Sequence, residues 1–224
     1  MGIIDYKKLY ELQDRVLKVV FETESEFYLT GGTCLSRFYV EKRYSDDLDF
    51  FTNQSVRYSF AVKNIKKALQ TKFKSVVEEV ASKDFTRLRV DDLLQIDFVN
   101  DIAFRYKDIV VNENNLLDNI ENILSNKITA VIGRDNPKDI FDIFLISKFY
   151  TVDWDDILKS AHQKAGFSDE ELIVRLKSFP HEMLQEIKII DKTFLDNFEI
   201  EFSNIIDKIF ETNHENHSTI ITRT

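Results

Sequence analysis

The sequence is most informative at residues 43–50, which read RYSDDLDF. Asp47 and Asp49 stand one residue apart in an apolar run that continues to Phe51. On a β-strand, the side chains at positions i and i+2 point to the same face of the sheet. We therefore expect two carboxylates side by side, which repel each other and resist burial unless a cation compensates them. Oxygen ligands of this kind suit Mg²⁺ or Mn²⁺ rather than zinc.

The residues just before this strand favour phosphate binding. Residues 26–29 have the pattern of a short strand, and a turn at Gly31 and Gly32 follows. Glycine allows positive φ and a close approach of the backbone. Thr33 then caps or opens a helix that we expect to reach about residue 40. The free N–H groups at the start of such a helix attract a phosphate.

This order, a glycine turn followed by an acidic strand, resembles the nucleotidyltransferase superfamily with its DNA polymerase β-like catalytic core. More narrowly, it is similar to the AbiEii family of nucleotidyltransferase-like toxins, whose pattern is a Gly-Gly or Gly-Ser turn and then an Arg-x-Ser-x-Asp-x-Asp strand. The residues that match this pattern are Gly31, Gly32, Arg43, Ser45, Asp47 and Asp49. A second block, residues 126–147, matches the family at Lys127, Arg134, Lys138, Asp139 and Asp142. The family more often has Arg where this chain has Lys138.

The composition of the 224-residue chain is that of a globular protein. Hydrophobic residues make up 43% of the chain and include 19 Phe, which is enough for a sizeable core. The single cysteine, Cys34, excludes an intramolecular disulfide and fits a reducing cytoplasm. No window approaches the ~20 apolar residues of a membrane span. We therefore expect a cytoplasmic protein with no membrane partner.

The net charge of −9 argues against a general nucleic-acid binder. The charge is unevenly distributed, however, because six basic residues and no acidic residue lie between Arg57 and Lys74. This basic stretch is either a solvated helix face or an electrostatic guide for nucleotide or RNA phosphates.

Hydrophobic periodicity predicts an α+β fold. Helices are expected at 5–22 and 55–73, the second with Phe60, Ile65 and Leu69 facing inward. Strands are expected at 75–80, 85–90 and 93–98. The remaining helices are expected at 116–132, 137–150, 154–161, 169–177, 179–189 and 194–210. The chain would thus comprise a polymerase β-like nucleotidyltransferase lobe (1–113), with a mixed β-sheet flanked by helices, and an all-helical C-terminal lobe (114–224).

A third acidic residue belongs to the predicted site. Asp97 lies in the apolar strand LLQIDFV, where a carboxylate is costly unless it is paired or binds a metal. The resemblance implies that Asp47, Asp49 and Asp97 hold two Mg²⁺ ions and that Asp97 lies near the attacking hydroxyl, whose proton it can accept. The alternatives are that Asp47 and Asp49 bind backbone N–H groups at a strand end, and that Asp97 caps a turn.

The other predicted site residues concern the nucleotide. Gly31, Gly32 and Thr33 would cradle the β- and γ-phosphates of a nucleoside triphosphate. Ser45 would bond a phosphate or orient Asp47. The roles open to Arg43 are a salt bridge with an acidic neighbour and a contact with the triphosphate.

The second block adds two positions that the resemblance implies are functional. Lys127 would neutralise triphosphate charge. Asp139 either anchors Lys127 or Arg134, or caps its helix through the helix dipole. Asp142 is expected to be structural, and Asp46 points to the opposite strand face and is left outside the site.

The leading hypothesis is therefore an enzyme that transfers a nucleoside monophosphate from an NTP to an acceptor with Mg²⁺ or Mn²⁺. The resemblance implies the toxin of a bacterial toxin–antitoxin or abortive-infection system. Its acceptor would be the 3′ end of tRNA or a protein hydroxyl, and its partner a cognate antitoxin. Two alternatives keep the fold: a catalytically decayed nucleotide- or antitoxin-binding module, and an antibiotic-modifying nucleotidyltransferase.

Overall fold

The computed structural model describes residues 4–102 and 104–221, with side chains up to residue 212. The described residues form two compact units. The first unit contains the residues up to Tyr39 together with Tyr44–Asn119, and the second contains Val40–Arg43 together with the residues from Ile120 onwards. Each unit has its own hydrophobic core, and the α+β class predicted from the sequence is confirmed.

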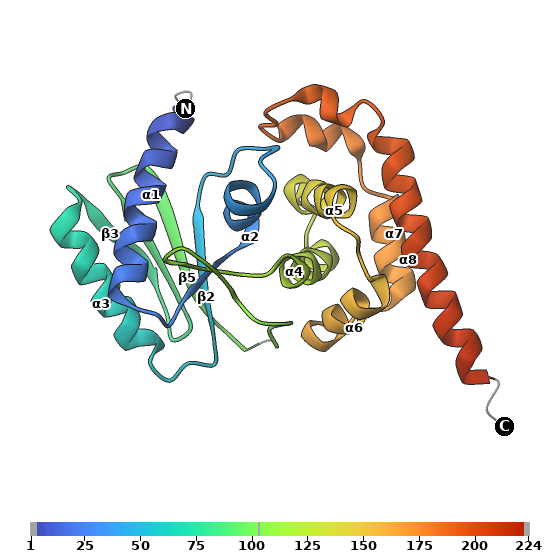
Figure 1. Cartoon of the computed structure of the whole chain (residues 1–224), viewed down its shortest axis with the longest axis horizontal. Helices are drawn as coiled ribbons and strands as arrows, with labels where there is room; N and C mark the ends of the chain where they lie inside the picture. The colour runs from blue at the N-terminus through green and yellow to red at the C-terminus, as the bar shows by residue number, and fades with distance from the viewer. Residues whose placement is uncertain (1–3, 103, 222–224) are drawn as a thin grey trace. The chain divides into compact units, whose positions relative to one another are not determined.

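The first unit is built on a seven-stranded sheet with strand order β3-β4-β5-β2-β1-β7-β6. Figure 1 shows α1 and α3 side by side next to this sheet. The elements of the unit, in chain order, are α1 (Tyr6–Thr23), β1 (Tyr28–Thr30), α2 (Gly31–Cys34), the π-helix η1 (Leu35–Tyr39), β2 (Leu48–Asn53), α3 (Tyr58–Lys72), β3 (Val76–Ala81), β4 (Phe85–Val90), β5 (Leu94–Asp101), β6 (Val110–Asn112) and β7 (Asn115–Leu117).

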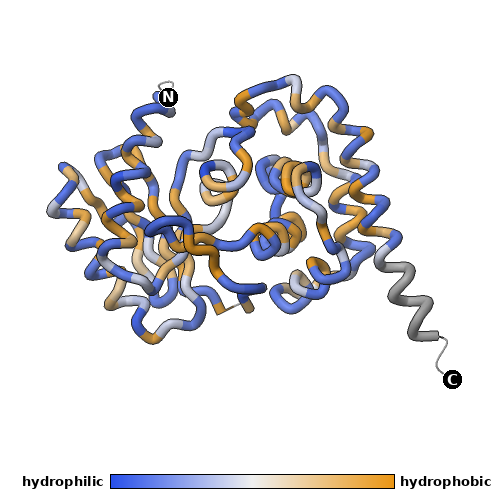
Figure 2. The backbone as a smooth tube through the Cα atoms, in the orientation of Figure 1, coloured by the Kyte–Doolittle hydropathy of each residue, from blue (hydrophilic) through white to orange (hydrophobic). Residues whose placement is uncertain are grey.

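The sheet is mixed, as the sequence predicts, because β2 runs parallel to β5 and β1 runs parallel to β7, while the other pairs are antiparallel. One face of the sheet carries the core of the unit. Phe50 of β2 lies opposite Phe98 of β5, and the two buried rings stack with their centroids 5.3 Å apart. Buried positions recur along α1 at helical spacing, for example Leu9, Leu12 and Val16. Figure 2 shows hydrophobic and hydrophilic segments alternating along this helix. The residues next to Phe50 and Phe98 in sequence therefore point to the opposite face of the sheet.

The second unit is helical. In this unit α4 packs against α5, α6 and α7, and α8 packs against α5, α6 and α7. Its elements are α4 (Ile120–Gly133), α5 (Pro137–Phe149), α6 (Trp154–Lys164), α7 (Asp169–Lys177), the 3₁₀-helices η2 (His181–Glu186) and η3 (Lys192–Leu195), and α8 (Phe198–Ile221).

Helix α5 is the centre of the second unit. All residues from 139 to 146 are buried, so the helix is enclosed on every side. Pro137 occupies its first turn, and the Asn136 side chain accepts a hydrogen bond from the Lys138 N–H at 3.0 Å. No helix within the described residues, α5 included, is long and apolar enough to cross a bilayer.

Most predicted elements are confirmed, and the differences have simple causes. Phe60, predicted to face inward, is 59% exposed, whereas Ile65 and Leu69 are buried as predicted. The buried residues of α3 fall at the helical spacing set by Tyr58 and Ile65, and Phe60 lies off that stripe. The helix predicted at 179–189 is instead the 3₁₀-helix η2. The helix predicted at 194–210 is present as α8, which begins at Phe198 after the 3₁₀-helix η3.

Two short strands were not predicted. Strands β6 and β7 form a hairpin around Glu113, which has a φ of 54°, and β7 pairs with β1. Consequently the helix expected from residue 116 begins at Ile120, and the residues from 114 to 119, assigned above to the helical lobe, belong to the sheet unit. Three-residue strands have no periodicity that a sequence pattern can reveal.

Candidate active site

A row of four side chains crosses the face of the sheet that lies opposite the Phe50–Phe98 core. The strand register places Arg87 of β4 opposite Asp97 of β5, Asp97 beside Asp49 of β2, and Asp49 opposite Thr30 of β1. Residues that lie directly opposite each other on neighbouring strands share a face. Two of the three predicted carboxylates are therefore neighbours on one surface, with a guanidinium at the end of the row.

The Asp49 carboxylate packs directly on the glycine turn. Gly31 has a φ of +70°, and a Cβ atom added there would lie 2.6 Å from Oδ2 of Asp49. This distance is too short for any non-bonded contact, and the positive φ is itself costly for other residues. Glycine is thus required at position 31 for two reasons: the positive φ of the backbone and the nearby Asp49 carboxylate.

A hydrogen-bonded chain fixes the segment that carries Asp47. The Thr33 hydroxyl donates to the carbonyl oxygen of Asp47 and lies 2.8 Å from the Ser45 hydroxyl. The Tyr10 hydroxyl accepts from the N–H of Ser45 at 3.2 Å, and Gln13 Nε2 donates to the Ser45 carbonyl oxygen at 3.1 Å. Thr33 and Ser45 are both buried, so these contacts orient the backbone at Asp47.

The third predicted carboxylate, Asp97, is held by Arg87. Nε of Arg87 lies 2.7 Å from Oδ1 of Asp97, and a terminal nitrogen lies 2.6 Å from Oδ2. The hydrogen bonds to Asp97 raise the pKa of Arg87, and the charges of Glu79 and Asp47 act in the same direction. Asp97 therefore does not cap a turn. Arg87 was not among the predicted site residues, and the alternating strand FTRLRV beside LQIDFV was the signal that could have suggested it.

The acidic residues can be compared with the needs of a divalent cation. Among the described residues, no three acidic, histidine or cysteine side chains gather into a group that would hold a metal ion. Mg²⁺, however, commonly takes one or two protein carboxylates and completes its shell with water and substrate phosphates. Asp47 and Asp49 suit that pattern, whereas both oxygens of Asp97 bind Arg87.

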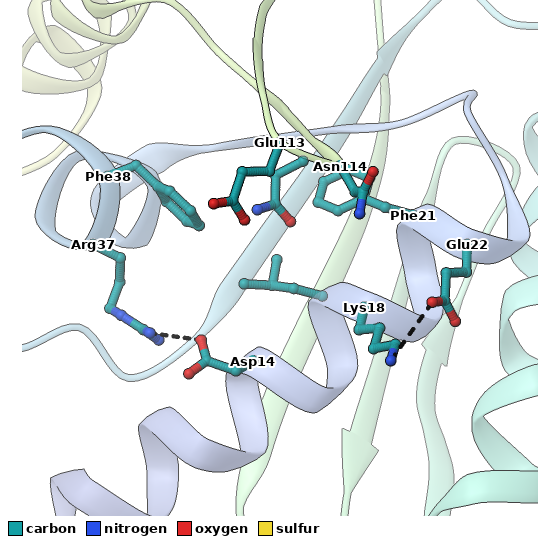
Figure 3. Close-up of a pocket in the computed structure, with 10 residues that line it drawn as sticks. Asp14, Lys18, Phe21, Glu22, Arg37, Phe38, Glu113 and Asn114 are labelled. Atoms are coloured by element: carbon teal, nitrogen blue, oxygen red, sulfur yellow. Dashed lines mark hydrogen bonds and ion pairs between the residues drawn. The ribbon is translucent and has the colours of Figure 1, made fainter.

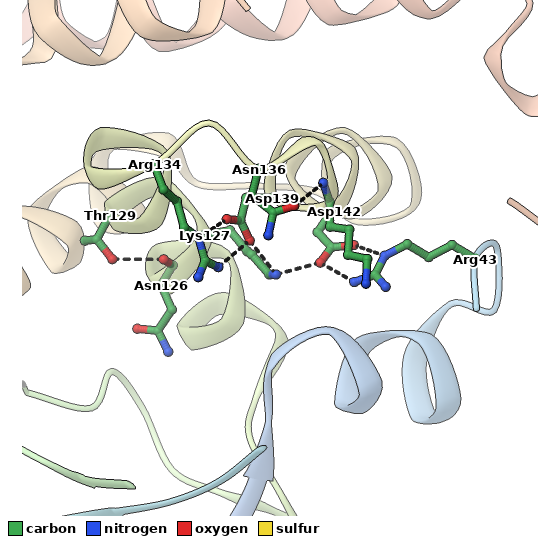
Figure 4. A network of polar contacts seen from close by, with 9 residues as sticks. Arg43, Asn126, Lys127, Thr129, Arg134, Asn136, Asp139 and Asp142 are labelled. Atoms are coloured by element: carbon green, nitrogen blue, oxygen red, sulfur yellow. Dashed lines mark hydrogen bonds and ion pairs between the residues drawn. The ribbon is translucent and has the colours of Figure 1, made fainter. Parts of the chain in front are cut away.

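The predicted residues of the second unit form a buried ion network (Figure 4). Arg43 binds Asp142 through two nitrogens at 2.7 and 2.8 Å, and Lys127 Nζ lies 2.8 Å from both Asp142 and Asp139. Nε of Arg134 completes the network at 2.7 Å from Asp139. Arg43 and Lys127 are only 2% and 8% exposed. The salt bridge expected as one role of Arg43 is present, and Asp139 contacts both Lys127 and Arg134.

The network keeps its members charged. Burial alone would lower the pKa of Lys127, but the charges of Asp142 and Asp139 outweigh it and raise that pKa. Burial alone would raise the pKa of Asp142, but Arg43 and Lys127 outweigh it and lower that pKa. Each of the two carboxylates therefore lies between two cations inside the unit. Asp46, left outside the predicted site, accepts a hydrogen bond from the Tyr6 hydroxyl at 2.6 Å.

A hollow of about 440 Å³ lies beside the first unit's α1 and η1 (Figure 3). Its charged side chains pair with each other: Arg37 with Asp14 at 2.6 Å and Lys18 with Glu22 at 3.8 Å. Arg37 also donates to Gln13, which in turn binds Ser45. These hydrogen bonds therefore connect Arg37, in the wall of the hollow, to Ser45, which lies two residues before Asp47.

The sheet thus has a strand β1 that runs into a glycine-led helix and a strand β2 that sets one carboxylate, Asp49, against that glycine, an arrangement that suits a nucleotidyltransferase. The family model described as nucleotidyl transferase AbiEii toxin, type IV toxin–antitoxin system, matches residues 15–218. The chain belongs to this family and is a nucleotidyltransferase.

Two solved structures have the same fold. JHP933 from Helicobacter pylori is 19% identical with a TM-score of 0.60, and the match covers 100% of both chains. MenT4, a nucleotidyltransferase toxin from Mycobacterium tuberculosis, is 13% identical with a TM-score of 0.61, and the match covers 93% of this chain and 84% of MenT4. No curated protein matches the sequence.

The contact between Gly31 and Asp49 predicts a specific coupling. Gly31→Ala should destabilise the protein by about 2 kcal/mol, because it combines a positive φ with a clash against the carboxylate. In an Asp49→Ala background the same substitution should cost less, since only the backbone strain remains. Urea unfolding measures both values. Gly166→Ala is the control, because nothing lies within 4 Å of its added Cβ. Equal costs in the two backgrounds would show that the carboxylate does not press on the turn.

The buried network predicts a large effect on stability. Asp142→Ala should lower the free energy of unfolding by about 3–5 kcal/mol, because Arg43 and Lys127 are left buried without that carboxylate. Asp155→Ala, which removes the partner of exposed Lys159 on α6, should cost less than about 1 kcal/mol. Denaturant titration of the two variants makes the comparison, and similar small losses in both would contradict the network's structural importance.

Proposed function

We propose that the chain transfers a nucleoside monophosphate from an NTP to an acceptor, with release of pyrophosphate, in a reaction that requires Mg²⁺ or Mn²⁺. The observation that carries this proposal is the placement of Asp49 against Gly31, with Asp47 tied to the same helix through Thr33. A phosphate-binding turn and a pair of metal-binding carboxylates are the two parts that nucleotidyl transfer needs, and they adjoin here.

The proposed roles follow from the contacts. Asp47 and Asp49 would hold the metal ion, which supplies charge neutralisation at the triphosphate when bound. Gly31 and Gly32 would offer backbone N–H groups to the phosphates. The hydroxyl of Thr33 is already bonded to the Asp47 carbonyl oxygen, so Thr33 and Ser45 would serve chiefly to orient Asp47.

The contacts of Lys127 favour a role other than the one expected, and those of Arg43 and Asp139 favour the structural alternative given for each. Lys127, predicted to neutralise triphosphate charge, already faces two carboxylates, and the guanidinium of Arg43 is bound by Asp142. We infer that Arg43, Lys127 and Asp139 act on the reaction through the stability of their unit.

A basic stripe on α3 favours an RNA acceptor, such as the 3′ end of tRNA, over a protein hydroxyl. The stripe consists of exposed residues that recur at spacings of three and four: Phe60, Lys63, Lys67 and Gln70. Lys66 is paired with Glu78 at 3.0 Å, but within the described residues Lys63 and Lys67 make no ion pair. Phosphates bind such unpaired lysines, and the exposed Phe60 ring offers a base a stacking surface.

The biological setting in the proposal is that of the family. The chain would be the toxin of a toxin–antitoxin pair, acting in the cytoplasm and restrained by a cognate antitoxin. The decayed-module alternative leaves Asp47 and Asp49 beside the glycine turn without a purpose. The antibiotic-modifying alternative leaves the basic stripe unexplained.

Removal of one carboxylate tests the chemistry. Asp49→Asn should lower transfer of labelled NTP to total tRNA by about a hundredfold or more, since the charge that holds the metal is lost. Asp46→Asn is the matched control, because Asp46 binds Tyr6 and should leave transfer near the wild-type level. Circular dichroism verifies that both variants fold. Wild-type transfer by Asp49→Asn would refute the proposed metal site.

Charge reversal tests the acceptor. Lys63→Glu/Lys67→Glu should weaken tRNA binding at least tenfold and reduce its salt dependence, because two phosphate contacts are lost. Lys7→Glu/Lys8→Glu on α1 makes the same change in net charge outside the stripe. Filter binding at several salt concentrations compares the two. An equal loss in both variants would mean that net charge, and not the stripe, determines binding.

A further inference from the structure

We propose that Arg87 is a positioning residue that competes with the divalent cation for Asp97, so that Asp97 joins the metal site only when the triphosphate of the substrate has drawn Arg87 away. This inference rests on the proposed function. It assigns a role to a residue that neither the sequence pattern nor the family resemblance identified.

The geometry of the pair supports this role. Both carboxylate oxygens of Asp97 accept hydrogen bonds from Arg87, at 2.7 and 2.6 Å, and Gln95 Nε2 approaches Oδ2 at 3.3 Å. Each oxygen keeps a further acceptor site, but the guanidinium charge beside Asp97 repels a divalent cation and so weakens Asp97 as a ligand. The guanidinium therefore stands where the third carboxylate would otherwise receive a metal ion.

The charge balance of the row also supports competition. Asp49 and Asp97 are in-register neighbours on β2 and β5, and the charge of Asp47 reaches Arg87 as well. A divalent cation held by Asp47 and Asp49 would therefore lie next to the Arg87–Asp97 pair. Arg87 and that cation would compete for Asp97 because each stabilises its charge.

The Arg87 side chain is exposed enough to move away from Asp97. Its side chain is 33% exposed, whereas that of Asp97 is 11% exposed, so the arginine forms the outer half of the pair. A guanidinium binds phosphate oxygens in the same two-pronged geometry that it uses with a carboxylate. A triphosphate that extends from the glycines after β1 across the face of β2 and β5 would offer such oxygens, and its arrival would free Asp97 for the metal and for the proton of the attacking hydroxyl.

Another arginine of the same strand, Arg89, provides a matched control for Arg87. Arg89 lies two residues further along β4, on the same face, and its Nε and a terminal nitrogen bind Glu79. Its side chain is 32% exposed, close to the value for Arg87. Arg89→Gln therefore removes the same charge and the same kind of ion pair without freeing a carboxylate of the predicted site.

Competition of this kind predicts coupling between metal and nucleotide. In the wild type, Mn²⁺ alone should bind weakly, and a non-hydrolysable NTP analogue should tighten Mn²⁺ binding for two reasons: its phosphates supply ligands, and it removes the competitor. Only the second effect depends on Arg87. Arg87→Gln should bind Mn²⁺ alone at least fivefold more tightly than the wild type and should show a smaller effect of the analogue. Arg89→Gln should behave like the wild type.

Electron paramagnetic resonance of free Mn²⁺ measures these affinities on the full chain, without and with the analogue. Unchanged or weaker Mn²⁺ binding by Arg87→Gln, or an equal gain in Arg89→Gln, would overturn the proposal. Arg87→Lys keeps the charge but loses the two-pronged contact, so it should give an intermediate affinity and serves if the Gln variant fails to fold. Mn²⁺ binding that survives Asp49→Asn would instead refute the metal site of the proposed function, and the two failures are thereby distinguished.

Discussion

The close approach of the Asp49 carboxylate to Gly31 is the constraint on which the first unit's site depends. It joins two segments that are 18 residues apart and admits no side chain at position 31. The register of β1 with β2 sets this approach, and the bond from Thr33 to the Asp47 carbonyl oxygen holds the entry to β2. Gly31 is required because of Asp49, and the segment before Asp49 is held by Thr33 of α2. These two contacts explain why the informative residues lie within one short stretch of the sequence.

In the second unit, the electrostatic requirement is that buried charges be compensated by charges of opposite sign. Buried ion pairs commonly recover little more than their desolvation cost, so a network within an enclosed helix pair contributes chiefly by penalising the loss of any member. Arg43 is the member supplied from the segment before β2, and its partner Asp142 is 99 residues away. Residues that the family resemblance implied were functional thus have a sufficient structural reason in this fold.

The sequence predicted the parts of the fold that have strong periodicity or a local motif. The alternation of β4 and β5 and the glycines at the start of α2 are of this kind. Asp47, expected on the same strand as Asp49, instead lies just before β2. The sequence could not predict which strands are neighbours, so the partner of Asp97 was not foreseen, and a metal ligand was expected where Arg87 binds. The same limit applies to Arg43, because no local pattern tells whether a charge meets a phosphate or a distant carboxylate.

In the row Arg87–Asp97–Asp49, a guanidinium compensates the repulsion between adjacent carboxylates. Acidic residues in adjacent positions of a sheet repel each other, and the folded state of this unit must tolerate them before any ligand arrives. A guanidinium at the end of the row meets that need by pairing with Asp97. In the proposed mechanism, the interaction that stabilises the unliganded sheet is also the one that would have to be broken for Asp97 to bind the metal, so stability and activity would compete at a single ion pair.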